Sequence, residues 1–307
     1  MRTVVRKNVG MEMDLDAAID FVATHGRLLD RRRLGLLLGS GSPHGVLAAL
    51  DAYRNPDGGY GWALEPDQRS ATSQPVAVMH ALEVLADIRD TTSRRPAELC
   101  DWLAGHTLPD GGVPFGLPYT DTAGSARHWI DADATTSSLQ MTAQLAAQAH
   151  RLAPYRPDVA GHPWLAGATA YCLDSIDLLT GTPHAYEVMF ALRFLDAVTA
   201  ELPRAHALID RLLRHVVSDG PTPVTGGADG EALHLLDFTP YADAPSRASF
   251  TDAAVAADRE RLTRAQQPDG GWTVDYPTYS PAAALEWRGY ATLQAVAVLR
   301  ETPRWRP

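Results

Sequence analysis

Gln266-Gln267-Pro268-Asp269-Gly270-Gly271-Trp272 is the stretch that decides the fold, because the same turn occurs at two earlier places in the chain. The earlier copies are Asn55-Pro56-Asp57-Gly58-Gly59-Tyr60-Gly61-Trp62 and Leu108-Pro109-Asp110-Gly111-Gly112-Val113-Pro114-Phe115. Proline presets φ, aspartate hydrogen-bonds to its own backbone, and glycine takes a positive φ without steric cost, so Pro-Asp-Gly-Gly predicts a tight turn. At least one aromatic residue follows each copy.

The spacing of the three turns indicates a repeat of about 50 residues. Asp57 and Asp110 are 53 residues apart, and Asp110 and Asp269 are 159 residues apart, which is three times 53. Two further copies are therefore expected near residues 163 and 216, where the weaker turn sequences Gly161-His162-Pro163 and Asp219-Gly220-Pro221 lie. A period of this length is typical of helical pairs that bury their faces against neighbouring pairs.

Between the turns, apolar residues recur at helical spacing, as at Leu285, Leu293 and Val296. The predicted helices cover residues 13–25, 28–38, 43–54, 72–89, 95–105, 135–152, 165–179, 184–200, 203–217, 249–266 and 281–300, with a weaker one near 229–236. No sustained alternation of apolar and polar residues predicts a strand. We expect an all-α (α/α)6 toroid, built as a single domain over residues 13–307 after a flexible N-terminal segment, residues 1–12.

The composition excludes several classes of function. Lys and Arg number 27 against 37 Asp and Glu, giving a net charge of −10 without a basic run, so nucleic acid and anionic membranes are poor partners. Cys100 and Cys172 lie far apart without a C-x-x-C partner, which argues against a disulfide framework. Neither a secretory h-region nor an apolar run of about 18 residues is present. We expect a cytoplasmic protein without stable membrane insertion.

The three turns resemble the Gln-Trp repeat of squalene–hopene cyclases and, more broadly, the prenyltransferase and squalene oxidase repeat. The copy at 266–272 resembles it most fully, and the framework extends from about residue 45 to 300. This resemblance implies the α/α toroid of terpenoid cyclases and of protein prenyltransferase β subunits, with a central cavity lined by aromatic side chains. Because similar toroids serve as cyclases, transferases and binding domains, the resemblance is more specific for the fold than for the chemistry.

Asp131-Ala132-Asp133-Ala134-Thr135-Thr136 resembles the Asp-x-Asp-Asp-Thr motif of class II terpenoid cyclases. The resemblance implies Asp133 as the acid that protonates an alkene or epoxide, with Asp131 as its support and Ala134 in place of the last aspartate. Such an acid stays neutral until it reacts, which requires apolar surroundings. The other interpretation is that these residues only cap the helix predicted to begin near residue 135.

Further candidates would bind the substrate. Aromatic faces stabilise a carbocation, and the candidates are Trp62, Phe115, Trp129 and Trp272. Glu65 and Asp67 follow the first turn and either position a polar group of the ligand or belong to a solvated loop. Glu187 lies on an apolar helical face, so it is either desolvated, paired with an arginine such as Arg193 or Arg288, or placed at a helix end.

No metal or other cofactor is expected. Protein prenyltransferases hold zinc with Asp, Cys and His, but neither Cys100 nor Cys172 has an aspartate two residues before it. A P-loop, a dinucleotide fingerprint, a G-x-S-x-G nucleophile and the Asp-Asp-x-x-Asp run of class I terpene synthases are also absent from the sequence.

We therefore expect a terpenoid-cyclase-like protein whose partner is a small hydrophobic isoprenoid, cyclised after protonation by Asp133. Two alternatives stay open. One is a non-catalytic toroid that binds a hydrophobic ligand or a partner protein. The other is a carbohydrate-active α/α-barrel enzyme, which would need two carboxylates facing each other across a cleft.

Overall fold

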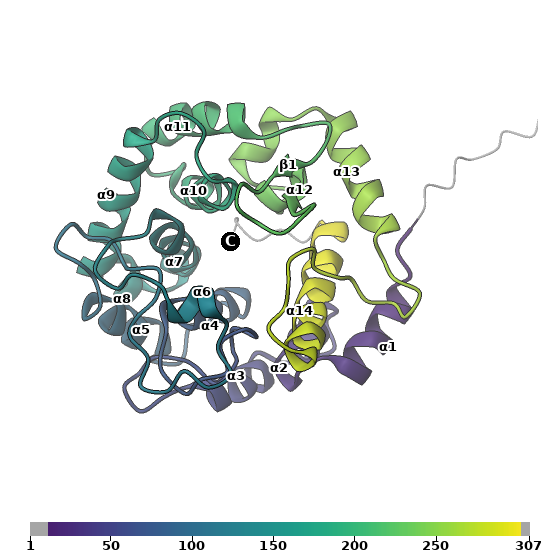
Figure 1. The fold of residues 1–307 in the computed structure, drawn as a ribbon, viewed down its shortest axis with the longest axis horizontal. Helices are drawn as coiled ribbons and strands as arrows, with labels where there is room; N and C mark the ends of the chain where they lie inside the picture. The colour runs from purple at the N-terminus through teal and green to yellow at the C-terminus, as the bar shows by residue number, and fades with distance from the viewer. Residues whose placement is uncertain (1–11, 302–307) are drawn as a thin grey trace, which may run out of the picture.

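The computed structural model describes residues 12–301 and confirms the predicted all-α toroid (Figure 1). The outer helices are α1 (Leu15–His25), α3 (Pro43–Leu50), α5 (Arg95–Ala104), α9 (Pro163–Leu178), α11 (Arg204–Leu212) and α13 (Asp252–Arg264). The inner helices are α2 (Leu28–Leu37), α4 (Pro75–Asp87), α7 (Leu139–Leu152), α10 (Ala185–Val198), α12 (Leu235–Phe238) and α14 (Pro281–Leu299). The chain alternates between the two rings, so each outer helix precedes its inner partner. Of the predicted N-terminal segment 1–12, all but Glu12 lies outside the described residues.

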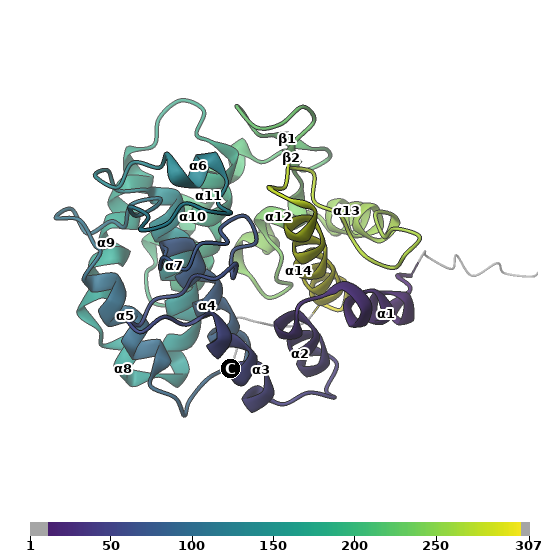
Figure 2. The same cartoon turned by 60° about the horizontal axis from the view of Figure 1, so that its bottom comes forward.

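Shorter elements complete the ring. They are α6 (Arg127–Ile130), α8 (Pro157–Ala160), and the 3₁₀ turns η1 (Asp51–Tyr53), η2 (Ala153–Tyr155), η3 (Leu213–His215) and η4 (Pro245–Ser249). Strands β1 (Thr222–Pro223) and β2 (Ala232–Leu233) pair antiparallel, with Thr222 opposite Leu233. The expectation of no strand is therefore wrong here, because two-residue strands are too short to produce an alternating pattern. Figure 2 shows α6 and this hairpin at the same end of the ring.

The three Pro-Asp-Gly-Gly turns are built alike. The carboxylate accepts a hydrogen bond from the backbone N–H two residues later, at 2.9, 3.1 and 3.2 Å for Asp57, Asp110 and Asp269. The first glycine of each turn has a φ of 89° or 90°, a conformation that favours glycine. Each turn leads from an outer helix into the loop before its inner partner.

Each turn also packs against the next outer helix along the ring. A Cβ atom on the second glycine would lie 2.7 Å from Trp102 of α5, 2.7 Å from Tyr171 of α9 or 2.8 Å from Phe21 of α1. Only a residue without a side chain permits these approaches. The turns therefore join neighbouring hairpins to each other as well as reversing the chain.

The last turn closes the ring between the two ends of the chain. Gln266 accepts a hydrogen bond from Asp14 N at 2.8 Å and donates one to Asp14 O at 2.7 Å. Trp272 is buried and donates from Nε1 to Leu262 O at 2.8 Å. The glutamine and tryptophan of this copy thus hold α1, α13 and α14 together.

The prediction of a repeat turn at residues 161–163 is wrong, whereas the one at residues 219–221 is confirmed. Gly161-His162-Pro163 lies before the outer helix α9, where His162 Nδ1 accepts from Trp164 N at 3.2 Å. The connection from α9 into α10 instead contains Gly181, with a φ of 69°. This connection has no Pro-Asp-Gly-Gly sequence to identify it. The repeat period is therefore the sole basis for the prediction, and it places the turn too early in the chain. Asp219-Gly220-Pro221 does lie between an outer helix, α11, and its inner partner.

Serine side chains cap the starts of two inner helices. Ser138 accepts from Met141 N at 3.1 Å and Ser280 accepts from Ala283 N at 3.2 Å, which satisfies free N–H groups of α7 and α14. The core lies between the two rings, and every residue of α4 from Pro75 to Ala86 is buried. Within residues 12–301, no helix combines the length and apolar character needed to cross a membrane.

The free energy of unfolding should depend on pH because of the buried carboxyl group of Asp196. This carboxylate of α10 is 6% exposed and accepts bonds from Ser246 N and Oγ of η4, both at 2.7 Å. Burial raises its pKa to about 7, although both hydrogen bonds oppose the shift. Because the unfolded chain loses this proton near its ordinary pKa of 3.8, the folded state loses stability as pH rises from about 4 to about 7.

We expect Asp196→Asn to remove this loss, which is on the order of 2–4 kcal/mol. Urea unfolding of both proteins at pH 4.5 and 8 measures it. The variant should gain stability relative to the native chain at the higher pH. An equal difference at both pH values would show that Asp196 ionises normally.

Candidate active site

The predicted acid Asp133 is exposed at the surface. Its carboxylate accepts hydrogen bonds from Thr135 Oγ1 at 2.6 Å, Thr136 Oγ1 at 2.7 Å and Thr135 N at 2.8 Å. These bonds lower the pKa of Asp133 to about 2. Asp131 is also exposed and pairs with Arg127 at 3.1 Å. An exposed carboxylate that is ionised at neutral pH holds no proton to donate, so this geometry does not support the assignment of Asp133 and Asp131 as the acid and its support.

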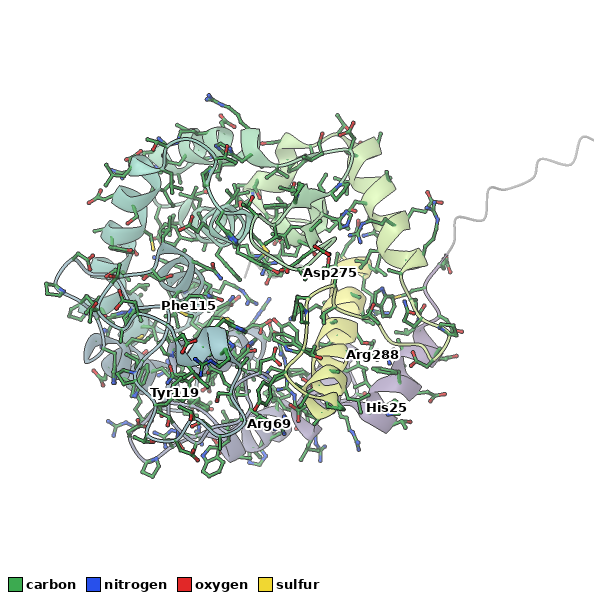
Figure 3. The ribbon with its side chains drawn as sticks, viewed as in Figure 1. His25, Arg69, Phe115, Tyr119, Asp275 and Arg288 are labelled. Atoms are coloured by element: carbon green, nitrogen blue, oxygen red, sulfur yellow. The ribbon has the colours of Figure 1, made fainter. Side chains whose placement is uncertain are left out.

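Of the four predicted aromatic candidates, Trp62 lies at the surface and Trp272 lies in the core. Trp62 is 53% exposed and donates from Nε1 to Asn55 Oδ1 at 2.8 Å. Trp272 is enclosed between α13 and α14, as described above. Phe115 and Trp129 stack with their ring centroids 4.7 Å apart, on a loop and on α6. Figure 3 shows Phe115 and Tyr119 on the α4–α7 side of the ring and Asp275 on the α14 side.

Glu65 and Asp67 are buried, at 2% and 4% exposure, so the alternative of a solvated loop is wrong. Arg27 draws their loop inward by donating from Nη1 to the carbonyl oxygens of Ala63 and Leu64 at 3.1 and 3.0 Å. Contacts with residues far along the chain thus bury a segment whose own sequence is polar.

Asp67 ties this loop to the last inner helix. Its Oδ2 accepts from Trp287 Nε1 at 2.8 Å, and its Oδ1 accepts from Tyr279 N at 2.7 Å. Arg69 adds a two-point ion pair with Glu286 of α14, at 2.8 and 3.2 Å (Figure 3 labels Arg69). Both carboxylate oxygens of Asp67 therefore accept hydrogen bonds from N–H donors.

Glu65 contacts a buried histidine that the sequence did not single out. Glu65 Oε2 lies 3.0 Å from Nε2 of His80, and Glu83 Oε2 lies 3.6 Å from Nδ1 of the same ring. Burial by itself lowers the pKa of His80, but the hydrogen bonds and charges of Glu65 and Glu83 outweigh it and raise the pKa. The site therefore favours an imidazolium held between two carboxylates.

Aromatic rings surround this histidine on the α14 side. The ring centroids of Tyr290 and Trp287 lie 5.4 and 6.3 Å from that of His80, in edge-on arrangements. Tyr276, from the loop before α14, lies 5.3 Å from Trp287. Three aromatic side chains thus stand beside the buried acid–histidine pair, which we call the Glu65–His80 pair.

A second polar layer supports His80 through Glu83. Glu83 accepts from Gln294 Nε2 at 2.6 Å and pairs with Arg33 at 3.1 Å. Arg33 also pairs with Asp87 at 2.8 Å, and Asp87 pairs with Arg151 of α7 at 2.8 Å. These ion pairs connect α2, α4, α7 and α14 and so fix the orientation of the histidine.

A periodic signal could have found these residues. His80, Glu83 and Asp87 recur at i, i+3 and i+7 in an otherwise apolar helix, which places three titratable groups on one face. Trp287 and Tyr290 stand three residues apart in the last helix in the same way. Burial of ionisable groups on one face is a feature of functional sites.

Of the three interpretations of Glu187, the structure supports a position at a helix end. Its carboxylate accepts from His184 N at 3.4 Å and completes a capping box at the start of α10. The two suggested arginine partners bind elsewhere: Arg288 to Asp269 at 2.7 Å and Arg193 to Asp237 O at 2.6 and 3.2 Å. In the part of the chain that the structure describes, no group of three His, Cys, Asp or Glu residues is placed to hold a metal ion.

Solved structures share this fold. No protein-family model matches the sequence, and no curated protein matches it. A protein from Actinoplanes matches with 16% identity and a TM-score of 0.56, over 93% of this chain and 98% of the other. A variant of the type II terpene cyclase MstE from Scytonema, in complex with geranylgeranyl dihydroxybenzoate as substrate, matches with 12% identity and a TM-score of 0.57, over 94% and 97%. The chain therefore has a terpenoid-cyclase-like fold.

Proposed function

We propose that this protein cyclises an isoprenoid substrate by protonating it, with the Glu65–His80 pair as the proton source. The observation that carries the proposal is a buried carboxyl group, in contact with a histidine, beside three aromatic side chains. The terpene cyclases among the structural neighbours support the reaction class. Glu65 takes the place of Asp133 as the proposed acid because Glu65 is buried and Asp133 is exposed.

The proposed proton leaves from Glu65 Oε1. Oε2 is engaged by His80 at 3.0 Å, whereas Oε1 has, among residues 12–301, a single long contact, 3.4 Å from Asp67 N. Before it reacts, Glu65 takes up a proton from water at Oε1, while Glu83 balances the charge of the His80 imidazolium. That positive charge then favours departure of the proton from the Glu65 carboxyl group. The Oε1–H bond breaks, the π electrons of the alkene form the new C–H bond, and the carboxylate left behind pairs with His80.

The carbocation formed in this step needs electron-rich surroundings. The faces of Tyr276, Trp287 and Tyr290 attract a cation by several tenths to about 2 kcal/mol each. Both oxygens of Asp67 already accept N–H bonds, which makes this carboxylate a poor nucleophile toward the cation. At the end of the reaction the Glu65 carboxylate takes a proton from carbon, the electrons of that C–H bond form the new alkene, and the Oε1–H bond is restored.

Glu65→Gln tests this assignment. We expect the variant to lose product formation by about 10³-fold, because an amide cannot donate this proton, and general acids contribute about 10²–10⁴-fold. The substrates are geranyl, farnesyl and geranylgeranyl diphosphates, their free alcohols and geranylgeranyl dihydroxybenzoate, with products identified by mass spectrometry. The matched control is Glu98→Gln, which alters a partly exposed carboxylate paired with Arg54 at 2.9 Å.

Asp133→Asn provides the second comparison and should keep the native rate within about twofold. Loss of activity in Asp133→Asn with retention in Glu65→Gln would overturn the proposal. A native protein that is stabilised against heat by the alcohols but forms no product would instead be a binding toroid.

A further inference from the structure

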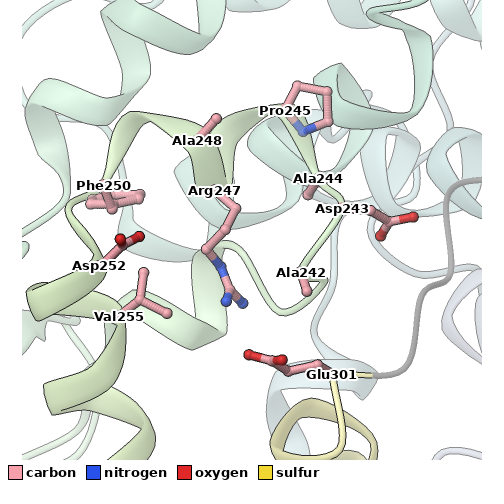
Figure 4. A pocket seen from close by; sticks show the side chains of 10 residues that line it. All are labelled: Ala242, Asp243, Ala244, Pro245, Arg247, Ala248, Phe250, Asp252, Val255 and Glu301. Carbon is pink, nitrogen blue, oxygen red and sulfur yellow. The ribbon is translucent and has the colours of Figure 1, made fainter.

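A pocket lies beside Glu301, the residue that follows the C-terminal end of α14 by two positions (Figure 4). It has a volume of about 480 Å³, and Arg247, Phe250, Asp252, Val255 and Glu301 are among its lining residues. Trp287 lies near the start of α14, whereas Glu301 follows the end of this helix. They are 14 positions apart, a helical rise of roughly 20 Å, so the pocket is separate from the proposed active site.

Arg247 is the unusual residue of this pocket. It is 8% exposed, and its Nε donates to Thr239 O at 2.8 Å and Oγ1 at 3.0 Å, while Nη2 also donates to Thr239 O. Among residues 12–301, Nη1 has no hydrogen-bond acceptor and no carboxylate lies within ion-pair distance of the guanidinium. Figure 4 shows the guanidinium directed into the pocket.

The neighbouring carboxylates act on this cation only from a distance. Glu301 is already paired with Arg259 at 2.9 Å. Burial, followed by the charge of Arg259, lowers the pKa of Arg247 and outweighs the opposing charges of Glu301, Asp258 and Asp196. A buried charge without a partner is costly, and an anion that enters the pocket would relieve that cost.

The remaining lining residues indicate the polarity and charge of the rest of the ligand. Ala244, Pro245, Phe250 and Val255 offer apolar surface, whereas the three acids Asp243, Asp252 and Glu301 oppose a second negative charge. The volume falls within the range of roughly 300–1,000 Å³ that small-molecule sites occupy. We propose that this pocket binds a monocarboxylate with an apolar body, whose carboxylate accepts from Arg247 Nη1.

Octanoate is the probe, and titration calorimetry measures its binding to the whole chain. We expect saturable binding of octanoate, at least tenfold weaker binding of 1-octanol, which lacks the charge, and none of inorganic phosphate. Arg247→Gln should weaken octanoate binding at least tenfold, because the amide can still donate to Thr239 O but carries no charge. The matched control is Arg94→Gln, which removes a 91% exposed arginine of the loop before α5.

A second variant keeps the test decisive if Arg247→Gln fails to fold. Ala248→Trp adds an indole to an exposed position of the pocket lining and leaves Arg247 in place, so it should also abolish octanoate binding. Glu65→Gln should bind octanoate like the native chain, which separates this inference from the proposed cyclase activity. Equal binding of 1-octanol, or undiminished affinity in both pocket variants, would overturn it.

Discussion

Gly270→Ala is expected to destabilise the protein by at least about 4 kcal/mol, a loss seen only when packing or backbone geometry is broken. Gly270 has a φ of 90°, and a Cβ atom there would lie 2.1 Å from Ala17 O and 2.4 Å from Ala17 C. Both atoms belong to the backbone of α1, so no side-chain rotation can relieve the clash. The substitution would separate α1 from the last turn and open the ring where its two ends meet.

Gly58→Ala is the matched control, because this glycine occupies the same position of the first turn. Its φ is 89°, but a methyl group on its Cα would have nothing within 4 Å. Only the strain of the left-handed conformation remains, about 1–2 kcal/mol. Urea unfolding followed by circular dichroism measures both losses. Equal losses for the two variants would show that the contact with α1 does not close the ring.

Glu83→Leu is expected to cost about 3–5 kcal/mol, the range for breaking one side of a buried ion pair. Glu83 is 4% exposed and accepts from Arg33 and Gln294 while facing His80. Its removal leaves Arg33 with Asp87 as its remaining ion-pair partner and leaves one face of His80 without a carboxylate. Thermal and urea unfolding measure the loss.

Glu98→Leu tests whether burial of the ion pair causes the large loss of stability expected for Glu83→Leu. Glu98 pairs with Arg54 at 2.9 Å, but both side chains are 35% exposed, so the loss should stay below about 1 kcal/mol. Adding Arg33→Met to Glu83→Leu should recover part of the stability, because the buried cation that lost one of its two carboxylate partners is then gone. A double variant that is less stable than Glu83→Leu would contradict this explanation.

The helical ring could be predicted because its signals are local. The predicted helix over 281–300 corresponds to α14 at Pro281–Leu299, and the one over 95–105 corresponds to α5 at Arg95–Ala104. The hairpin at 222–233 could not be predicted, and the weak helix near 229–236 begins only at Leu235, because segments of two to four residues are too short to show a period.

The candidate site could be predicted only in part. Glu65 and Asp67 stand out in the sequence, but their polar neighbours favour a solvated loop over burial. Asp133 stands out through a local motif, although the hydroxyl groups of Thr135 and Thr136 keep it ionised at the surface. His80 and Trp287 look like ordinary core residues, since nothing adjacent to them in the sequence identifies their polar partners.

The sequence by itself determined the turns and the repeat, because proline, aspartate and two glycines set a backbone path through their own chemistry. Only the tertiary structure decided which acid is buried. Glu65 meets His80 across 15 positions of the chain, and Asp67 meets Trp287 across 220. Burial and charge depend on such distant contacts, which closure of the ring creates and which no local pattern contains.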